Sequence, residues 1–219
     1  MPKLNDSELG GERILGLLNR YYAQDQWQPS AAQALSVWLS LVVTWNRKMD
    51  LTAARDAHEL FDIFVADSII LHRARQTLGI DSTWLDVGCG PGAPGLGMAI
   101  LDPTLPIALV EPNAKRVAFL RQVIGRIKLT QVRVICSRLE GLQREMADEA
   151  VSRATLAPDD WCRHGLPLVR RRVWLLLGRE PWQPPVGCNI EYDASYRWPH
   201  TGAARRVLAL SRAQEHSDR

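Results

Sequence analysis

The sequence predicts an α/β protein, in which an open, mainly parallel sheet carries helices on both faces and follows a cap of helices. Three observations predict this class. Residues 8–76 have the apolar spacing of helices, short apolar runs alternate with helical stretches from residue 83 onward, and a glycine-rich turn follows the first of those runs. Strands alternating with helices are typical of parallel sheets covered on both faces. We therefore divide the 219 residues into a helical cap (1–80) and a sheet domain (81–219) that form one compact unit.

The cap contains three helical stripes. Apolar side chains repeat at helical spacing over residues 14–22, 35–42 and 60–71. Pro29 lies in the break between the first two stripes, and Asp56 has the side chain of a helix N-cap in front of the third.

From residue 83 the periodicity changes to that of buried strands separated by helices. We expect strands at 83–87, 107–110, 132–136, around 150–151, and at 173–177. Helices are expected at 96–101, 114–128, 139–146 and 161–168. The segments 189–196 and 205–210 are typical of two final strands in an antiparallel hairpin.

Composition excludes several classes of protein. No apolar stretch reaches the roughly 18–20 residues of a membrane span, and the polar residues 1–8 lack the apolar core of a signal peptide, so we expect a cytoplasmic protein with no membrane partner. The four cysteines and five histidines are scattered without metal-ligand spacing, so no metal site is expected. A net charge of +3 does not by itself indicate nucleic-acid binding. No self-complementary apolar stripe is visible, and we expect a monomer.

The strongest chemical signal is the glycine-rich segment 86–95, between a predicted strand and a predicted helix. It contains a G-x-G-x-x-G match, which would suggest a dinucleotide, and a turn without a ligand is a further reading. Asp86 would oppose a pyrophosphate but attract a cationic ligand. Pro91 and Pro94 remove backbone donors that a phosphate would need. These details disfavour the dinucleotide.

The D-x-G-x-G-x-G form of this segment resembles the cofactor loop of methyltransferases that use S-adenosylmethionine (SAM). SAM carries a sulfonium and an ammonium group but no phosphate, which agrees with the acid at Asp86. Glu111 ends the next predicted strand, where a carboxylate can accept both ribose hydroxyls. Since dinucleotides and SAM both use such an acid, Glu111 indicates a nucleoside without choosing between them.

Four stretches in order resemble one family of such enzymes. They are Trp45–Thr52; Asp67–Ser68; Asp86–Gly95 with Lys115–Leu120; and Ser137–Glu140 with Ser152–Ala154. Together they are similar to the bacterial small-subunit ribosomal RNA (guanine-N7)-methyltransferases, the RsmG or glucose-inhibited division protein B family. The resemblance implies a Rossmann-like SAM-dependent methyltransferase sheet, SAM as cofactor, and methylation of N7 of a guanine in 16S rRNA. The implied partner is small-subunit rRNA or the 30S particle.

The same resemblance implies residue roles, carried over position by position. The cofactor residues would be Asp86, Gly88, Gly90, Gly92, Ala93, Glu111, Leu139, Glu140 and Arg153. The catalytic residues would be Arg153 and Asp67, and the RNA contacts Asn46, Arg47, Lys115 and Arg116. Guanine N7 has an in-plane lone pair and no proton, so we expect positioning of the base rather than acid–base catalysis.

Three positions depart from the family pattern. Ile63–Phe64 stand where the family has Arg-His, Leu177–Gly178 replace Lys-Gly, and Arg170–Arg171 replace Gly-Gly. These changes lie outside the glycine segment and concern the RNA side. Two other functions therefore stay open: a SAM-dependent methyltransferase of a small molecule or protein, and a non-catalytic RNA-binding or assembly protein on the same fold.

Overall fold

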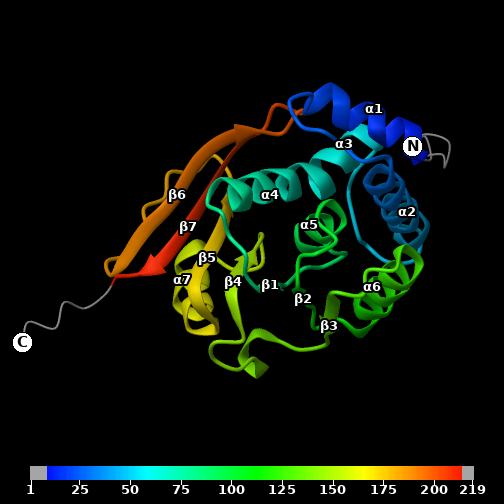
Figure 1. The fold of residues 1–219 in the computed structure, drawn as a ribbon. Helices are drawn as coiled ribbons and strands as arrows, with labels where there is room; N and C mark the ends of the chain where they lie inside the picture. The colour runs from blue at the N-terminus through cyan, green and yellow to red at the C-terminus, as the bar shows by residue number, and fades with distance from the viewer. Residues whose placement is uncertain (1–8, 214–219) are drawn as a thin grey trace, which may run out of the picture.

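The computed structural model describes residues 9–213, so the polar segment 1–8 of the sequence analysis lies outside the described residues. The elements follow the expected order of cap helices and then alternating strands and helices (Figure 1). The helical elements are α1 (Gly11–Tyr21), α2 (Pro29–Asn46), α3 (Ala57–Phe61), the π-helix η2 (Asp62–Ala66), α4 (Asp67–Thr77), α5 (Gly95–Leu101), α6 (Ala114–Ile127), the short η3 (Leu139–Gly141), α7 (Pro158–Gly165) and η4 (Leu166–Leu168). The strands are β1 (Trp84–Val87), β2 (Ile107–Val110), β3 (Val132–Ile135), β4 (Ala147–Ser152), β5 (Val169–Leu177), β6 (Cys188–Arg197) and β7 (Ala204–Arg212).

The strands form one seven-stranded sheet in the order β3-β2-β1-β4-β5-β7-β6. The first five are parallel, and β7 pairs antiparallel with both β5 and β6, which confirms the expected terminal hairpin. The order reverses between β1 and β4, because β2 and β3 lie on one side of β1 and the later strands on the other. Ligands of open α/β sheets bind at such a reversal, beyond the carboxyl ends of the strands.

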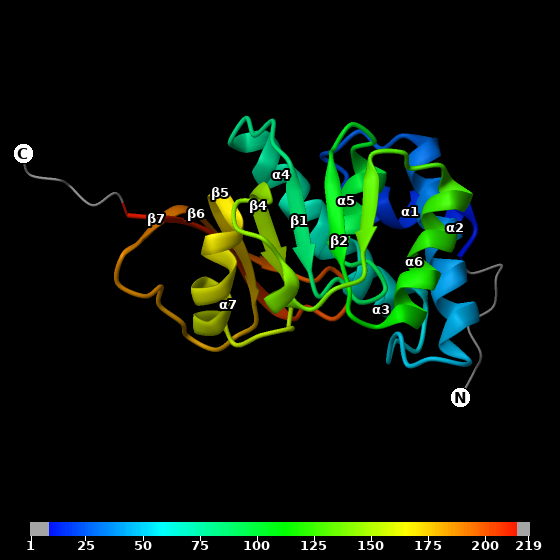
Figure 2. The same cartoon turned by 90° about the horizontal axis from the view of Figure 1, so that it is seen from below.

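Side-chain alternation along the strands gives the sheet two buried faces. Trp84 of β1 and Trp174 of β5 belong to one apolar cluster together with the cap helices, α5 and α6. Leu85 follows Trp84 and Val173 precedes Trp174, so their side chains lie on the opposite face of the sheet. There they pack with Trp161 of α7 in a second apolar cluster. Figures 1 and 2 show α7 on its own side of the sheet, away from α1 to α6. The expected coverage of both faces is confirmed.

The local expectations for the cap and the first three strands agree closely with the structure. Asp56 caps α3 by accepting hydrogen bonds from the amides of His58 and Glu59, at 2.9 Å each. The expected helix at 139–146 is wrong: after η3 the chain turns irregularly, and Glu145 has a φ of +53°. The expected start of the fifth strand at 173 is also wrong, since β5 begins at Val169. Cross-strand ion pairs to β4 neutralise Arg170 and Arg172 of that early segment, so their charge does not prevent pairing.

Two further features of residues 9–213 bear on the class of the protein. None of the helices within residues 9–213 is both long and apolar enough to span a membrane. In the same range, no three His, Cys, Asp or Glu side chains gather into a group that could hold a metal ion.

Candidate functional site

The glycine loop leads from the end of β1 to the start of α5 and uses a left-handed backbone at its glycines. Gly88 has a φ of +73°, and a β-carbon there would collide with the side chain of Thr155. Gly90 has a φ of +55°, but the space where its β-carbon would lie is open. Both angles are costly for residues that have a β-carbon. Gly88 therefore lets two loops pack together, whereas Gly90 leaves an open cradle on the loop.

Cap residues hold the glycine loop in place from above. The indole Nε1 of Trp38, in α2, donates to the carbonyl of Pro91 at 2.9 Å. The hydroxyl of Ser68, in α4, donates to the carbonyl of Pro94 at 2.9 Å. Ser68 is fully buried, so this contact fixes the loop to the same helix that begins with Asp67. These two hydrogen bonds make the cap helices part of the framework of the site.

Asp86 lies beneath the loop, fully buried at the end of β1. Its Oδ2 accepts a hydrogen bond from the Gly95 amide at 2.7 Å, while its Oδ1 is buried without a partner. Burial raises the pKa of this carboxyl to about 7, against the opposing effects of the Gly95 amide and the positive charge of Arg153. A buried acid with an unused oxygen favours a ligand that brings positive charge or a donor to this point.

Glu111 closes the loop from the end of β2. Its Oε2 accepts from the Gly90 amide at 3.0 Å, and its Oε1 accepts from the Asn113 amide at 2.8 Å. The side chain is 3% exposed, and a guanidinium nitrogen of Arg116 lies 4.0 Å from Oε2. Because Glu111 contacts the open Gly90 cradle, its carboxylate can serve the hydroxyls of a bound ribose.

The remaining expected cofactor residues lie along the same sheet edge. Ala93 is buried within the loop, close to Gly92, whose φ is +113°. Leu139 and Glu140 begin η3, directly after the β3 segment. Leu139 is half-buried against the cluster on the α7 side, and Glu140 is exposed. Since the carboxyl ends of parallel strands meet at one edge, the structure brings all expected cofactor positions to that edge.

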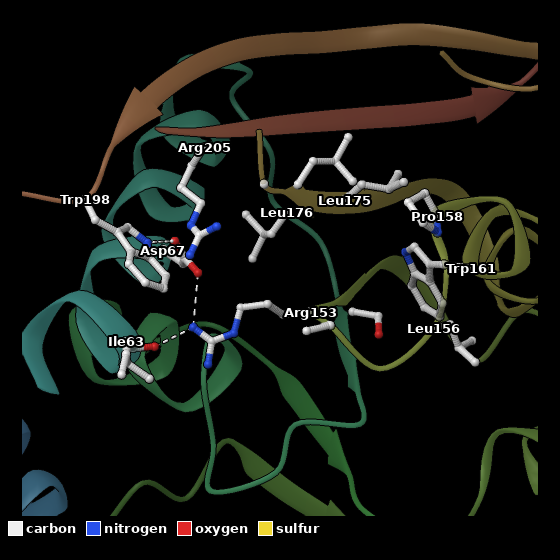
Figure 3. A pocket seen from close by; sticks show the side chains of 14 residues that line it. Ile63, Asp67, Arg153, Leu156, Pro158, Trp161, Leu175, Leu176, Trp198 and Arg205 are labelled. Carbon is white, nitrogen blue, oxygen red and sulfur yellow. Dashed lines mark hydrogen bonds and ion pairs between the residues drawn. The ribbon is translucent and has the colours of Figure 1, made fainter. Parts of the chain in front are cut away.

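A cavity of about 460 Å³ lies next to the glycine loop, at the carboxyl ends of β4 and β5 (Figure 3). The two are in direct contact, because the hydroxyl of Ser152 donates to the Val87 carbonyl at 2.9 Å and Thr155 packs on Gly88. Most of the cavity wall is apolar. Its lining includes Ile63, Asp67, Arg153, Leu156, Trp161, Leu175, Leu176, Leu177, Trp198 and Arg205.

Asp67 organises the polar side of this cavity. Its Oδ2 accepts from Arg153 at 3.1 Å, and its Oδ1 accepts from the Tyr196 hydroxyl and the Trp198 indole nitrogen, at 2.7 Å each. Arg153 also donates to the carbonyl of Ile63. Burial and the charge of Asp67 raise the pKa of Tyr196, which keeps it a donor. With both oxygens engaged and 1% exposure, Asp67 positions its neighbours and is not a free proton acceptor.

The four expected RNA-contact residues come together where α2 ends and α6 begins, but they differ in freedom. Asn46 bonds within its own turn: its Nδ2 donates to Thr52, and its Oδ1 accepts from the amides of residues 51 and 52, at 2.8 to 3.0 Å. Those bonds give the Asn46 side chain a structural role in the turn, and its contact with RNA stays a prediction. Arg47 and Lys115 are exposed, and Arg116 is half-buried between Glu111 and the Asp50 carbonyl, 3.4 Å away.

The positions that depart from the family pattern have different surroundings. Ile63, Leu177 and Gly178 line the cavity, so these departures make its wall more apolar. Phe64 is 1% exposed and packs in the core, where its ring contributes apolar area. Arg170 lies at the opposite end of β5 and pairs with Asp148 at 2.9 Å.

Sequence reasoning missed the residues that the terminal hairpin brings to the cavity (Trp198 and Arg205) and to Asp67 beside it (Tyr196). Tyr196, Trp198 and Arg205 come from β6, β7 and the turn between them, far along the chain from Asp67. The only local signal was the grouping of aromatic and basic residues around that turn. Their role depends on the pairing of β7 with β5, which a motif search does not reveal.

Comparisons with known proteins agree with this geometry. The model of the family described as rRNA small subunit methyltransferase G (GidB) matches residues 31–180. A ribosomal RNA small subunit methyltransferase G from Idiomarina loihiensis is 32% identical over 209 residues, covering 92% of this chain and 98% of that protein. One of the same name from Aliivibrio fischeri is 30% identical, covering 95% and 91%. Among solved structures, a candidate RNA methyltransferase, PH1948, from Pyrococcus horikoshii has a TM-score of 0.50 at 13% identity, with 68% and 85% covered, and shares the fold.

Proposed function

The chain belongs to the rRNA small subunit methyltransferase G family, and from this premise we propose that it transfers a methyl group from SAM to N7 of a guanine in 16S rRNA. The observation that carries the proposal is the direct contact between two neighbouring sites. An open glycine cradle lies between two buried acids, and a cavity of about 460 Å³, large enough for a nucleobase, adjoins the glycine loop through Ser152. A methyl transfer needs such a pair of sites, one for each reactant.

SAM fits the residues of the cradle. The unpartnered Oδ1 of Asp86 would receive the positive end of its methionine part, and Glu111 would accept the ribose hydroxyls. The backbone from Gly88 to Ala93 would hold the methionine part of SAM, and Leu139 and Glu140 would lie at its adenine. When bound, SAM supplies a methyl group activated by a positively charged sulfur. With its ribose at Glu111, which follows β2, SAM would extend across the end of β1 toward β4 and Arg153.

The chemistry asked of the protein is positioning. Guanine N7 attacks through a lone pair in the ring plane and loses no proton, so no side chain has to act as a base. Asp67, the buried carboxylate nearest the cavity, is engaged by three donors, in agreement with that requirement. Holding N7 about 3–3.5 Å from the methyl carbon supplies much of the rate enhancement. Arg153 would bound the base on the cofactor side.

We also propose the setting in which the protein works. Small-subunit rRNA is a cytoplasmic substrate, so the protein would act in the cytoplasm, as a monomer. The cap (1–80) and sheet domain (81–219) would act as one unit, because Trp38 and Ser68 of the cap hold the loop of the sheet domain. Sedimentation at working concentration checks the monomer.

Methyl-labelled SAM tests the reaction and the acceptor class together. Purified protein is incubated with labelled SAM and 30S particles that lack the modification, with naked 16S rRNA and with a protein extract as parallel acceptors. We expect label in the RNA of the particle or in naked 16S rRNA. Label found only in protein or in small molecules would mean that RNA is not the methyl acceptor. RNA binding without SAM affinity would instead identify a non-catalytic assembly protein.

A further inference from the structure

Arg205 is a cation at the rim of the cavity that the proposed mechanism does not use. Its guanidinium carbon lies 3.7 Å from the centre of the Trp198 ring, a cation–π contact. Within residues 9–213 no carboxylate lies within 4.0 Å of this guanidinium. Its neighbour Arg206 differs, since it forms a two-pronged pair with Asp193 at 2.7 and 2.8 Å. Arg206 is therefore paired within the hairpin, whereas Arg205 is left for a ligand.

The rim cation is held in place by the buried carboxylate described above. Asp67 accepts from the Trp198 indole at 2.7 Å, and the Trp198 ring in turn supports Arg205. Figure 3 shows the guanidinium groups of Arg205 and Arg153 on the side of the cavity where Asp67 lies, with Leu175 and Leu176, here called the leucine wall, towards the other side. Asp67 thus orients two arginines, Arg153 by direct contact and Arg205 through the indole.

The ligand class follows from the chemistry at the two parts of the cavity. A flat apolar base suits the leucine wall, and a phosphodiester suits an arginine at the rim. The proposed function places Arg153 at the cofactor side of the base, so the rim arginine, Arg205, is left for the RNA backbone. The narrow major groove of A-form RNA also hides N7 in a duplex, so the acceptor must be presented outside a regular helix.

We propose that Arg205, supported by Trp198, is a phosphate clamp that binds the RNA phosphate next to the acceptor guanosine. This assignment rests on the proposed function and adds a binding residue to it. Asp67 acts as the positioning residue of the clamp. The clamp takes a phosphodiester and has no contact with the carboxylate of SAM.

The test compares Arg205→Ala and Arg205→Lys with Arg133→Ala, which removes the same charge from an exposed position on β3. We expect Arg205→Ala to weaken RNA binding or raise the KM for unmodified 30S particles about tenfold, with an unchanged Kd for SAM. The slope of log Kd for RNA against log salt should fall by about 0.7 to 1, as one phosphate contact is lost. Arg205→Lys should recover most of the binding, because a phosphate accepts a point charge.

Four results would overturn the clamp. Equal losses for Arg205→Ala and Arg133→Ala would show general electrostatics only, and a weaker Kd for SAM would place Arg205 at the cofactor. Arg205→Lys as weak as Arg205→Ala would indicate a base edge read by the guanidinium fork. Thermal unfolding of each variant, expected to match the wild type, separates loss of fold from loss of contact. Wild-type methylation is measured first: its absence would reject the proposed function, whereas its presence with a normal Arg205→Ala variant would reject the clamp alone.

Discussion

The carboxylate of Asp67 and the guanidinium of Arg153 lie 3.1 Å apart, although 86 positions separate them in the chain. Asp67 begins α4 of the cap, and Arg153 follows β4 of the sheet. The same carboxylate binds Trp198 from the terminal hairpin. Three parts of the chain therefore meet at one buried acid, beside the cavity expected to receive the acceptor.

Removing Arg153 should cost both stability and activity. Arg153→Ala leaves the carboxylate of Asp67, whose side chain is 2% exposed, without its cation, and we expect a loss of about 3 kcal/mol in the free energy of unfolding. Adding Asp67→Asn removes the uncompensated negative charge. The double variant should therefore lose less stability than the two single variants lose together. Urea unfolding of the four proteins measures this. Additive losses would mean that the two side chains do not interact.

Two glycine positions separate folding from cofactor binding. Gly90 and Gly79 have φ values of +55° and +60°, and a β-carbon would meet open space at both. Alanine at either position should cost about 1 kcal/mol of stability, since a left-handed residue is strained to that extent. Only Gly90→Ala places a methyl group in the cradle, so only that variant should weaken SAM binding, by at least tenfold. Calorimetric titration measures the affinity of each variant for SAM. Equal affinities in the two variants would mean that SAM does not bind at Gly90.

Asp86 should make stability depend on pH. Burial raises its folded-state pKa to about 7, so the folded chain keeps a proton that the unfolded chain has lost above its ordinary pKa. Stability from this group is therefore present at low pH and is lost as pH rises through 7. Between pH ~5.5 and ~7 the loss is about 2 kcal/mol. Asp86→Asn keeps an oxygen for the Gly95 amide and should remove this dependence, as measured by urea unfolding at each pH. If the free energy of unfolding changed with pH equally in wild type and variant, the pH dependence would belong to another group.

Asn46 and Arg47 should respond differently to alanine, although they are neighbours. Asn46→Ala removes three hydrogen bonds of the 46–52 turn and should cost about 2 kcal/mol of stability. Arg47→Ala removes an exposed charge and should leave stability unchanged within about 0.5 kcal/mol. If Arg47 contacts RNA, its variant also weakens RNA binding at normal stability. A stable Asn46→Ala that binds RNA poorly would restore a direct RNA role for Asn46.

The fold was largely predictable because local patterns were strong. Alternating strands and helices indicated the parallel sheet, and the glycine segment located its ligand edge. Asp86 and Glu111 were predicted at that edge because Asp86 lies near the end of one strand and Glu111 directly follows the next, where the topology fixes their places. The errors arose where a charge hid a strand, as at Arg170–Arg172, or where a helical turn ended early, as η3 does at Gly141.

The polar side of the cavity was only partly predictable. Asp67 and Arg153 were singled out by the family resemblance, but their contact depends on how the cap docks on the sheet. Trp198 and Arg205 were missed because their place depends on two antiparallel pairings of the last strand. The turn-building bonds of Asn46 were not predicted, because a motif position does not tell whether an amide bonds inward or faces a partner.

Chemical cleavage at N7-methylguanine tests the central claim most directly. Unmodified 30S particles are treated with the protein and SAM, and their 16S rRNA is then reduced and cleaved with aniline, which breaks the chain at the cationic base. The account predicts one new cleavage band that requires SAM and is lost in Gly90→Ala but kept in Gly79→Ala. Methyl label in the RNA without such a band would contradict N7 as the acceptor.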